Sequence, residues 1–201
     1  MEFWPAPLTG WILAAVPRAQ MVRKPLQVRP RSRRTLDQRL WLRFPRLAAA
    51  THRLIARLEP GSRLREAAVW RASQLAVEAY NRRDLDAVAI GFHPDLEYYP
   101  YREFVDAALV EPCYHGLSGY RAYIESTYEV WGADVQLAPT ELIDLGDRLV
   151  LLADMPMRAQ ASGVPLAETY ACVSTLKDGR VIRQQDFLDQ AEALEAAGVS
   201  P

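Results

Sequence analysis

The sequence predicts an α+β fold in which a curved antiparallel sheet wraps over three helices. Two observations predict it. Apolar residues recur at helical spacing between residues 62 and 131, and the period becomes strand-like from residue 135 onward. The strand-like segments also follow one another through tight turns, which is typical of α+β rather than α/β proteins. A sheet bent over helices leaves a cavity where its concave face is incompletely filled.

Length and composition indicate one well-cored domain with an appendage. The chain has 201 residues, of which 50% are hydrophobic, and a net charge of −1. Its charge is uneven: residues 1–65 carry 14 Lys and Arg against 3 Asp and Glu, whereas residues 66–201 carry 10 against 22. No stretch approaches the roughly 20 apolar residues of a spanning helix. We therefore expect a cytoplasmic protein without a transmembrane segment, whose two cysteines are ordinary reduced thiols.

The first 36 residues are rich in Pro and Arg and have no sustained period, which predicts a disordered extension. Its basic run, Arg29 to Arg34, is compatible with binding to nucleic acid or to an anionic membrane surface. No aromatic residues interleave with the run as they do in a base-stacking platform. We therefore favour a solvated tail and expect no nucleic-acid partner.

Residues 37–61 are predicted to contain a basic amphipathic helix. Leu47, Leu54 and Leu58 recur at helical spacing, with several arginines elsewhere on the turn. Such a helix either lies on a membrane or packs against a neighbouring domain or a partner subunit. The stripe is narrow and aliphatic, which favours packing, and we expect His52 to lie on the surface.

The main domain is predicted to span residues 62–201. Ser62 is the expected N-cap of a helix that runs to Tyr80, and Asp84 is the expected cap of a short helix after it. The further predicted elements are that short helix over 85–92, a strand over 96–99, an irregular segment over 101–115, a helix over 118–130, strands over 135–144, 148–161, 166–176 and 181–188, and a closing helix over 189–197.

Four segments of this domain, in this order, resemble those of the nuclear transport factor 2-like (NTF2-like) superfamily, and within it the SnoaL-like proteins. They are Ala79–Ala87, Phe92–Glu97, His115–Arg121 and Lys177–Arg183. The resemblance implies a cone-shaped, cystatin-like fold around a pocket and a homodimer formed through the sheet. Members of the superfamily include ketosteroid isomerases, polyketide cyclases, epoxide hydrolases, dehydratases and non-catalytic binding proteins. The fold alone therefore leaves the function open.

The enzyme classes make different demands on the site. An isomerase needs a carboxylate base and two donors for a dienolate oxygen. The positions that match these roles hold Tyr99, Ala76 and Ala171, so we do not expect a ketosteroid isomerase. No ordered Asp-Arg-Asp trio aligns with the relay of an epoxide hydrolase. A cyclase needs mainly one carboxylate in an apolar pocket, and that alternative survives.

Strand alternation suggests which side chains face the pocket. In the last strand, the family's phase places Gln184 and Asp186 inward, and in the first strand Glu97 and Tyr99 share the inner face. Burial would raise the pKa of such a carboxyl group, which makes Asp186 or Glu97 a candidate general base or acid, with Tyr99 as a catalytic donor. The remaining predicted ligand-binding residues are Tyr123, Trp131, Met155 and Met157.

Three hypotheses follow from these patterns. The first is a pocket protein that transfers a proton on a small hydrophobic carbonyl or polyketide-like ligand, and it needs no cofactor. The second is a non-catalytic binding protein with the same pocket. The third is an interaction module that dimerises through its sheet while the basic arm contacts an acidic partner. The chain shows no metal-ligand spacing, so we expect no metal site.

Overall fold

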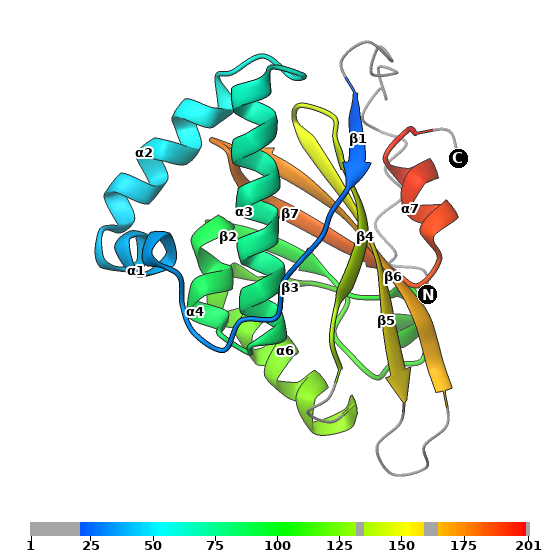
Figure 1. The fold of residues 1–201 in the computed structure, drawn as a ribbon. Helices are drawn as coiled ribbons and strands as arrows, with labels where there is room; N and C mark the ends of the chain where they lie inside the picture. Colours follow the sequence, from blue (N-terminus) through cyan, green and yellow to red (C-terminus); the bar gives the residue numbers. More distant parts are fainter. Residues whose placement is uncertain (1–20, 132–134, 159–164, 200–201) are drawn as a thin grey trace.

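The structure, a computed structural model, describes residues 21–131, 135–158 and 165–199 (Figure 1). Its elements in chain order are β1 (Val22–Pro25), α1 (Leu36–Arg43), α2 (Pro45–Ala56), α3 (Arg63–Asn81), α4 (Leu85–Val88), the 3-10 turn η2 (Ala89–Gly91), β2 (Phe92–Tyr99), α5 (Arg102–Asp106), β3 (Tyr114–His115), α6 (Gly116–Trp131), β4 (Ala138–Asp144), β5 (Arg148–Arg158), β6 (Pro165–Lys177), β7 (Arg180–Phe187) and α7 (Gln190–Ala196). The predicted α+β architecture is confirmed.

The described strands form one curved sheet of order β1-β4-β5-β6-β7-β2-β3. Neighbouring strands are antiparallel except β2 and β7, which run parallel with Tyr98 beside Gln184. Across the next pair, Cys172 of β6 lies opposite Asp186 of β7. These registers bring residues from three strands together near the middle of the sheet.

Helix α3 lies across the concave face of the sheet (Figure 1). Its start is fixed as expected, because the Ser62 side chain accepts a hydrogen bond from the backbone N–H of Arg65. One stripe of the helix carries only methyl side chains, at Ala68, Ala72 and Ala76, four residues apart. Because these alanines fill little space, a cavity remains between α3 and the sheet.

The opposite face of the sheet is covered by α7. Ile143 and Val150 pack in one core cluster with Leu194 of α7, and all three are at most 5% exposed. Successive side chains of a strand point to opposite faces. Leu142, next to Ile143, therefore points to the cavity side. The sheet thus has a solid face under α7 and a hollow face under α3.

A buried ion pair fixes the start of α3 against the β4–β5 turn. Arg65 binds Asp144 through two hydrogen bonds, Nε to Oδ2 at 2.8 Å and Nη2 to Oδ1 at 2.9 Å. The backbone N–H of Gly146 donates to the same carboxylate at 2.9 Å, and Arg65 donates to the carbonyl oxygen of Gly146. The two side chains are 3% and 1% exposed, so the pair is almost completely removed from water.

The N-terminal segment differs from its prediction. Residues 1–36 were predicted to be disordered, but residues 22–25 form β1 and pair with β4, and Leu26 is 1% exposed. Residues 1–20 lie outside the described part. A strand at the edge of the sheet tolerates Pro25, because one side of an edge strand needs no backbone donor. Proline content was therefore a poor guide to this segment.

Residues 37–61 form two helices instead of one. The chain turns at Phe44, and Pro45 occupies the first position of α2, where its missing N–H costs nothing. Ion pairs hold this helical hairpin and the segment just before it to the main domain. Arg34 makes two 2.7 Å hydrogen bonds to Asp84, which lower the pKa of Asp84 to about 2. As predicted, Asp84 also caps α4.

Candidate functional site

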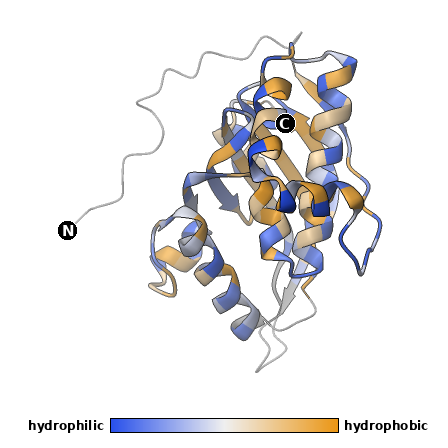
Figure 2. Ribbon diagram, turned by 90° about the vertical axis from the view of Figure 1, so that its left-hand side faces the viewer, coloured by the Kyte–Doolittle hydropathy of each residue, from blue (hydrophilic) through white to orange (hydrophobic). Residues whose placement is uncertain are grey.

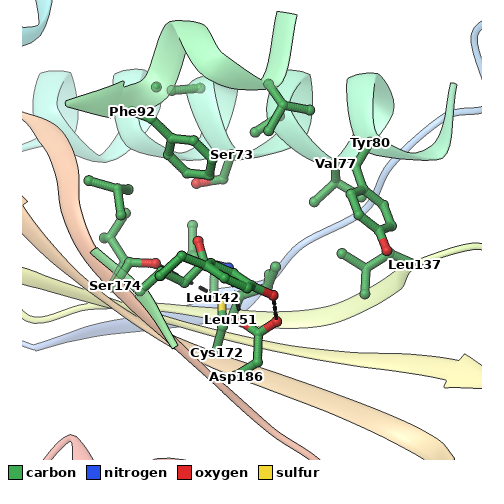
Figure 3. Close-up of a pocket in the computed structure, with 18 of the residues that line it drawn as sticks. Ser73, Val77, Tyr80, Phe92, Leu137, Leu142, Leu151, Cys172, Ser174 and Asp186 are labelled. Carbon is green, nitrogen blue, oxygen red and sulfur yellow. Dashed lines mark hydrogen bonds between the residues drawn. The ribbon is translucent and has the colours of Figure 1, made fainter. Parts of the chain in front are cut away.

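A cavity of about 210 Å³ lies between α3, α6, the end of α2 and the hollow face of the sheet. Most of its lining is aliphatic or aromatic, with α3 contributing Ala72, Ser73, Val77 and Tyr80 (Figure 3). An apolar cavity of roughly 150 Å³ is large enough to hold benzene. The cavity here therefore suits a ligand with one or two rings.

Asp186 of β7 points from the sheet into this cavity (Figure 3). It is 5% exposed and accepts three hydrogen bonds, two from neighbouring strands and one from its own strand. Tyr170 and Gln184 each donate to Oδ1 at 3.0 Å, and the hydroxyl of Tyr98 donates to Oδ2. A carboxylate offers about four acceptor positions. Since Oδ1 has two donors and Oδ2 has one, Oδ2 retains one position for a proton from a ligand.

Burial raises the pKa of Asp186 from 3.8 to about 6. Removal from water is the largest cause and raises the value, because it disfavours the charged form. The hydrogen bonds from Tyr98, Gln184 and Tyr170 oppose it, because they stabilise the carboxylate. Asp186 is therefore mostly ionised at neutral pH but holds a proton more tightly than an ordinary aspartate does.

Tyrosine hydroxyls surround this carboxylate. Burial and, after it, the negative charge on Asp186 raise the pKa values of Tyr101 and Tyr123 above their usual value. Burial also raises the pKa of Tyr80, which lines the same cavity. All three phenols are neutral at pH 7 and can donate a hydrogen bond. The cavity thus combines one carboxylate with several neutral donors.

Replacing Tyr98 by phenylalanine is expected to raise the pKa of Asp186 above 6, because the lost hydrogen bond stabilised the charged carboxylate. Carboxyl-carbon NMR chemical shifts followed against pH would measure the change. The matched control is Tyr99→Phe, whose ring lies on the other face of β2 and which should leave the titration of Asp186 unmoved. An unshifted titration in Tyr98→Phe would show that this hydroxyl does not stabilise the carboxylate.

The structure places four predicted site residues in the cavity wall: Asp186, Gln184, Met155 and Tyr123. The side chains of two others, Trp131 and Met157, lie outside the described part of the chain. Whether any of the six acts on a ligand stays a prediction. The positions of Gln184 and Asp186 show only that these two side chains of the last strand point into the cavity, as expected.

Glu97 and Tyr99 do not line the cavity, so their expected inward orientation is wrong. The hydroxyl of Tyr99 donates to Glu97 Oε2 at 3.2 Å, and the guanidinium of Arg183 lies 4.4 Å from the centre of the Tyr99 ring. The inward residues of β2 are instead Leu96 and Tyr98, at 0% and 1% exposure. A shift of one residue moves every side chain of a strand to the other face.

Sequence reasoning missed Tyr98 and Tyr170, the two hydroxyl donors to Asp186. For Tyr98 the sequence does contain a signal. Leu96 is the only aliphatic residue of this strand and is expected to point inward, so Tyr98, two residues further on, points to the same face. Tyr170 is paired with Ala153 of the neighbouring strand β5, and its side chain lies on the same face of β6 as that of Cys172. Its position depends on pairing between strands, which a single sequence does not display.

Helix α2 closes one end of the cavity, which corrects the expectation that His52 lies on the surface. His52 is 6% exposed and lines the cavity together with Ile55 and Ala56. The helix crosses the β6–β7 turn so closely that a Cβ on Gly179 would collide with the backbone carbonyl of His52. Gly179 also has a φ of +72°, so a side chain there is unfavourable on both counts.

The family match covers most of the elements that build this cavity, but not α2. Residues 74–184 match the SnoaL-like domain, which is more than half of the chain. The chain belongs to the SnoaL-like domain family. The matched region of this SnoaL-like domain runs from the middle of α3 into β7, and Asp186 lies two residues beyond it. No curated protein matches the chain.

Solved structures confirm the NTF2-like fold of this SnoaL-like domain. An NTF2-like protein of unknown function from Burkholderia pseudomallei shares 26% identity with a TM-score of 0.53, over 63% of this chain and 95% of that one. TerC, crystallised with polyporic acid, shares 23% identity with a TM-score of 0.52, over the same 63% and 95%. Within the described residues, no helix of the SnoaL-like protein is long and apolar enough to cross a bilayer.

Proposed function

We propose that this SnoaL-like domain binds a small, mainly hydrophobic carbonyl compound and transfers a proton on it, with Asp186 as the general base. One observation carries the proposal: among the described lining residues, Asp186 supplies the only carboxylate, and its pKa is raised to about 6. A base works best when its pKa lies near the operating pH. The largely apolar wall supports a hydrophobic ligand.

In this proposal, Asp186 removes a proton from the carbon next to the ligand's carbonyl group and later returns it. The negative charge then develops on the carbonyl oxygen, where a neutral phenol of the cavity wall would donate a hydrogen bond. Tyr80, Tyr101 and Tyr123 are the candidates. Gln184 and Tyr170 hold the carboxylate in place, and Tyr98 takes the position that the sequence assigned to Tyr99.

A second function, ligand binding without catalysis, is favoured by a different observation. Asp186 already accepts three hydrogen bonds from Tyr98, Tyr170 and Gln184, which lie on β2, β6 and β7. A carboxylate with these partners can join three strands without acting on a ligand. The same cavity would then serve as a carrier or sensor site.

Hydrogen exchange distinguishes the two functions. Acetophenone, 1-indanone and 2-tetralone have one or two rings and exchangeable protons next to the carbonyl, and NMR in D₂O follows the loss of those protons. We expect the wild type to accelerate exchange of at least one compound, and Asp186→Asn to lower that rate by about a hundredfold or more. The matched control is Asp154→Asn, which changes an exposed carboxylate on β5 outside the cavity and should retain the rate.

Thermal shifts with the same compounds complete the test. Binding without exchange in the wild type would favour the non-catalytic function. Unchanged exchange in Asp186→Asn would show that Asp186 is not the base. If no compound binds, the proposed ligand class is wrong. The homodimer, the cytoplasmic location and an acidic partner for the basic arm stay predictions.

A further inference from the structure

Large apolar side chains are exposed along the helical hairpin formed by α1 and α2. The most exposed of them is Leu36, at 83%. The full set on the hairpin is Leu36, Leu40, Phe44, Leu47 and Leu54, each at least 46% exposed. Elsewhere in the described chain, only Leu64 and Leu109 are large hydrophobic residues with comparable exposure. We call these five side chains and the arginines beside them the hairpin face.

The arginines of the hairpin face are exposed and have no acidic partners among the described residues. They are Arg39, Arg43, Arg46, Arg53 and Arg57. The hairpin's one carboxylate, Asp37, is 2.9 Å from Arg71 of α3 and so does not neutralise any of them. Five positive charges therefore stand beside five apolar side chains. Elsewhere the domain pairs many of its exposed arginines, as Arg23 is paired with Glu141 at 2.8 Å.

The two faces of α2 have different roles. Ala48 and His52 are buried, at 5% and 6% exposure, and point toward the domain. Leu47 and Leu54, seven residues apart, share an exposed side of the helix, and the exposed Arg46 and Arg53 lie about 100° further around it. Figure 2 looks onto the side of the molecule that carries α1 and α2, where hydrophobic and hydrophilic residues alternate along the helices. Domain packing thus accounts for the inner stripe of α2 but leaves the outer one uncovered.

We infer that the hairpin face docks on the surface of an anionic lipid bilayer. Leucine and phenylalanine side chains enter the boundary between headgroups and acyl chains, while arginines reach lipid phosphates with their long stems extended. A nucleic acid would use the arginines but would leave the leucines in water. A second copy placed face to face would bring two sets of five unpaired arginines together. A bilayer is the occupant that satisfies both kinds of side chain.

Docking in this way orients the cavity as well. The inner face of α2 forms one end of the cavity through His52, Ile55 and Ala56. The outer face of the same helix would lie in the lipid headgroups. One helix therefore separates the cavity from the bilayer. This inference rests on the exposed face of the hairpin alone, so it stands whether or not Asp186 is a base.

Flotation of the full chain with lipid vesicles tests the inference. We expect binding to vesicles that contain phosphatidylglycerol, weak binding to pure phosphatidylcholine, and weaker binding in high salt. Losing one arginine is expected to reduce the partition about fivefold, and replacing one inserted leucine by serine about tenfold. The double variant Arg53→Gln/Leu54→Ser should therefore bind about fiftyfold more weakly.

The matched control is Arg102→Gln/Leu109→Ser, which makes the same two changes at exposed sites outside the hairpin. It should bind vesicles as the wild type does, and circular dichroism should show both variants folded. Equal vesicle binding by the two double variants would overturn the inference. So would binding to a single-stranded oligonucleotide that depends on Arg53 but not on Leu54, or a dimer in sedimentation velocity that only Arg53→Gln/Leu54→Ser abolishes.

Discussion

Replacing Asp186 by asparagine is expected to raise the free energy of unfolding at about pH 8 by up to about 3 kcal/mol. The folded protein holds this carboxyl group at a pKa of about 6, against 3.8 for the unperturbed group. The folded state therefore binds the proton more tightly than the unfolded state. Its stabilising contribution is complete below about pH 4 and is lost as the pH rises through 6. At higher pH the wild type keeps a charge buried, and asparagine removes that cost.

Urea unfolding at about pH 4 and at about pH 8 measures the effect. The gain from Asp186→Asn should be large at the higher pH and nearly absent at the lower one, where the wild-type carboxyl group is already neutral. Asp154→Asn, a change to an exposed carboxylate, should show no such dependence. If Asp186→Asn instead destabilises the protein at both values, the hydrogen bonds from Tyr98, Tyr170 and Gln184 matter more than burial of the charge.

This substitution would then have opposite effects on stability and on the proposed activity. The same burial that raises the pKa of Asp186 makes it a suitable base and costs folding energy at neutral pH. A stabilised and inactive Asp186→Asn protein would indicate a residue retained for its chemistry. A stabilised protein that still exchanges the ketone protons would separate the two properties.

Replacing Asp144 by alanine is expected to lower the free energy of unfolding by about 3–5 kcal/mol. The substitution leaves the guanidinium of Arg65, which is 3% exposed, without its carboxylate. It also removes the acceptor for the backbone N–H of Gly146. A buried charge without its partner is far more costly than a lost surface ion pair.

Thermal and urea unfolding would measure the loss, with Asp147→Ala as the control in the same turn. Asp147 is 73% exposed and its ion pair with Arg148 spans 3.5 Å, so we expect little change there. Replacing both members of the buried pair, as in Arg65→Met/Asp144→Leu, should recover much of the loss because no isolated charge remains. A small effect of Asp144→Ala alone would mean that water reaches Arg65 in the variant.

The sequence predicted most elements of the main domain because their signals are local. Ser62 and Asp84 are N-caps in the structure as in the prediction, and the turns at Gly146 and Gly179 join the expected strands. The inward phase of β7, with Gln184 and Asp186 in the cavity wall, was also correct. Caps, turns and alternation depend on residues a few positions apart, so one sequence contains them.

The faces of β2 could not be assigned as safely. Tyr98 and Tyr99 are adjacent and chemically alike, so the pair itself does not distinguish an inward from an outward position, and Leu96 gives the only local signal in this strand. The choice is made by the parallel pairing that sets Tyr98 beside Gln184, 86 positions further along the chain. β1 likewise depends on partners far away, as in the pairing of Arg23 with Ile143. Long-range pairing overrides local preference in both places.

The alanine stripe of α3 and the carboxylate of β7 lie on opposite walls of one cavity. A larger side chain at Ala68, Ala72 or Ala76 would take up cavity space from the wall opposite Asp186. Only glycine is smaller than alanine, so most substitutions at these positions would reduce the volume left for a ligand. Related chains would thus differ in the size of ligand that fits through single changes in one helix, while Asp186 and its hydrogen-bond donors stay as they are.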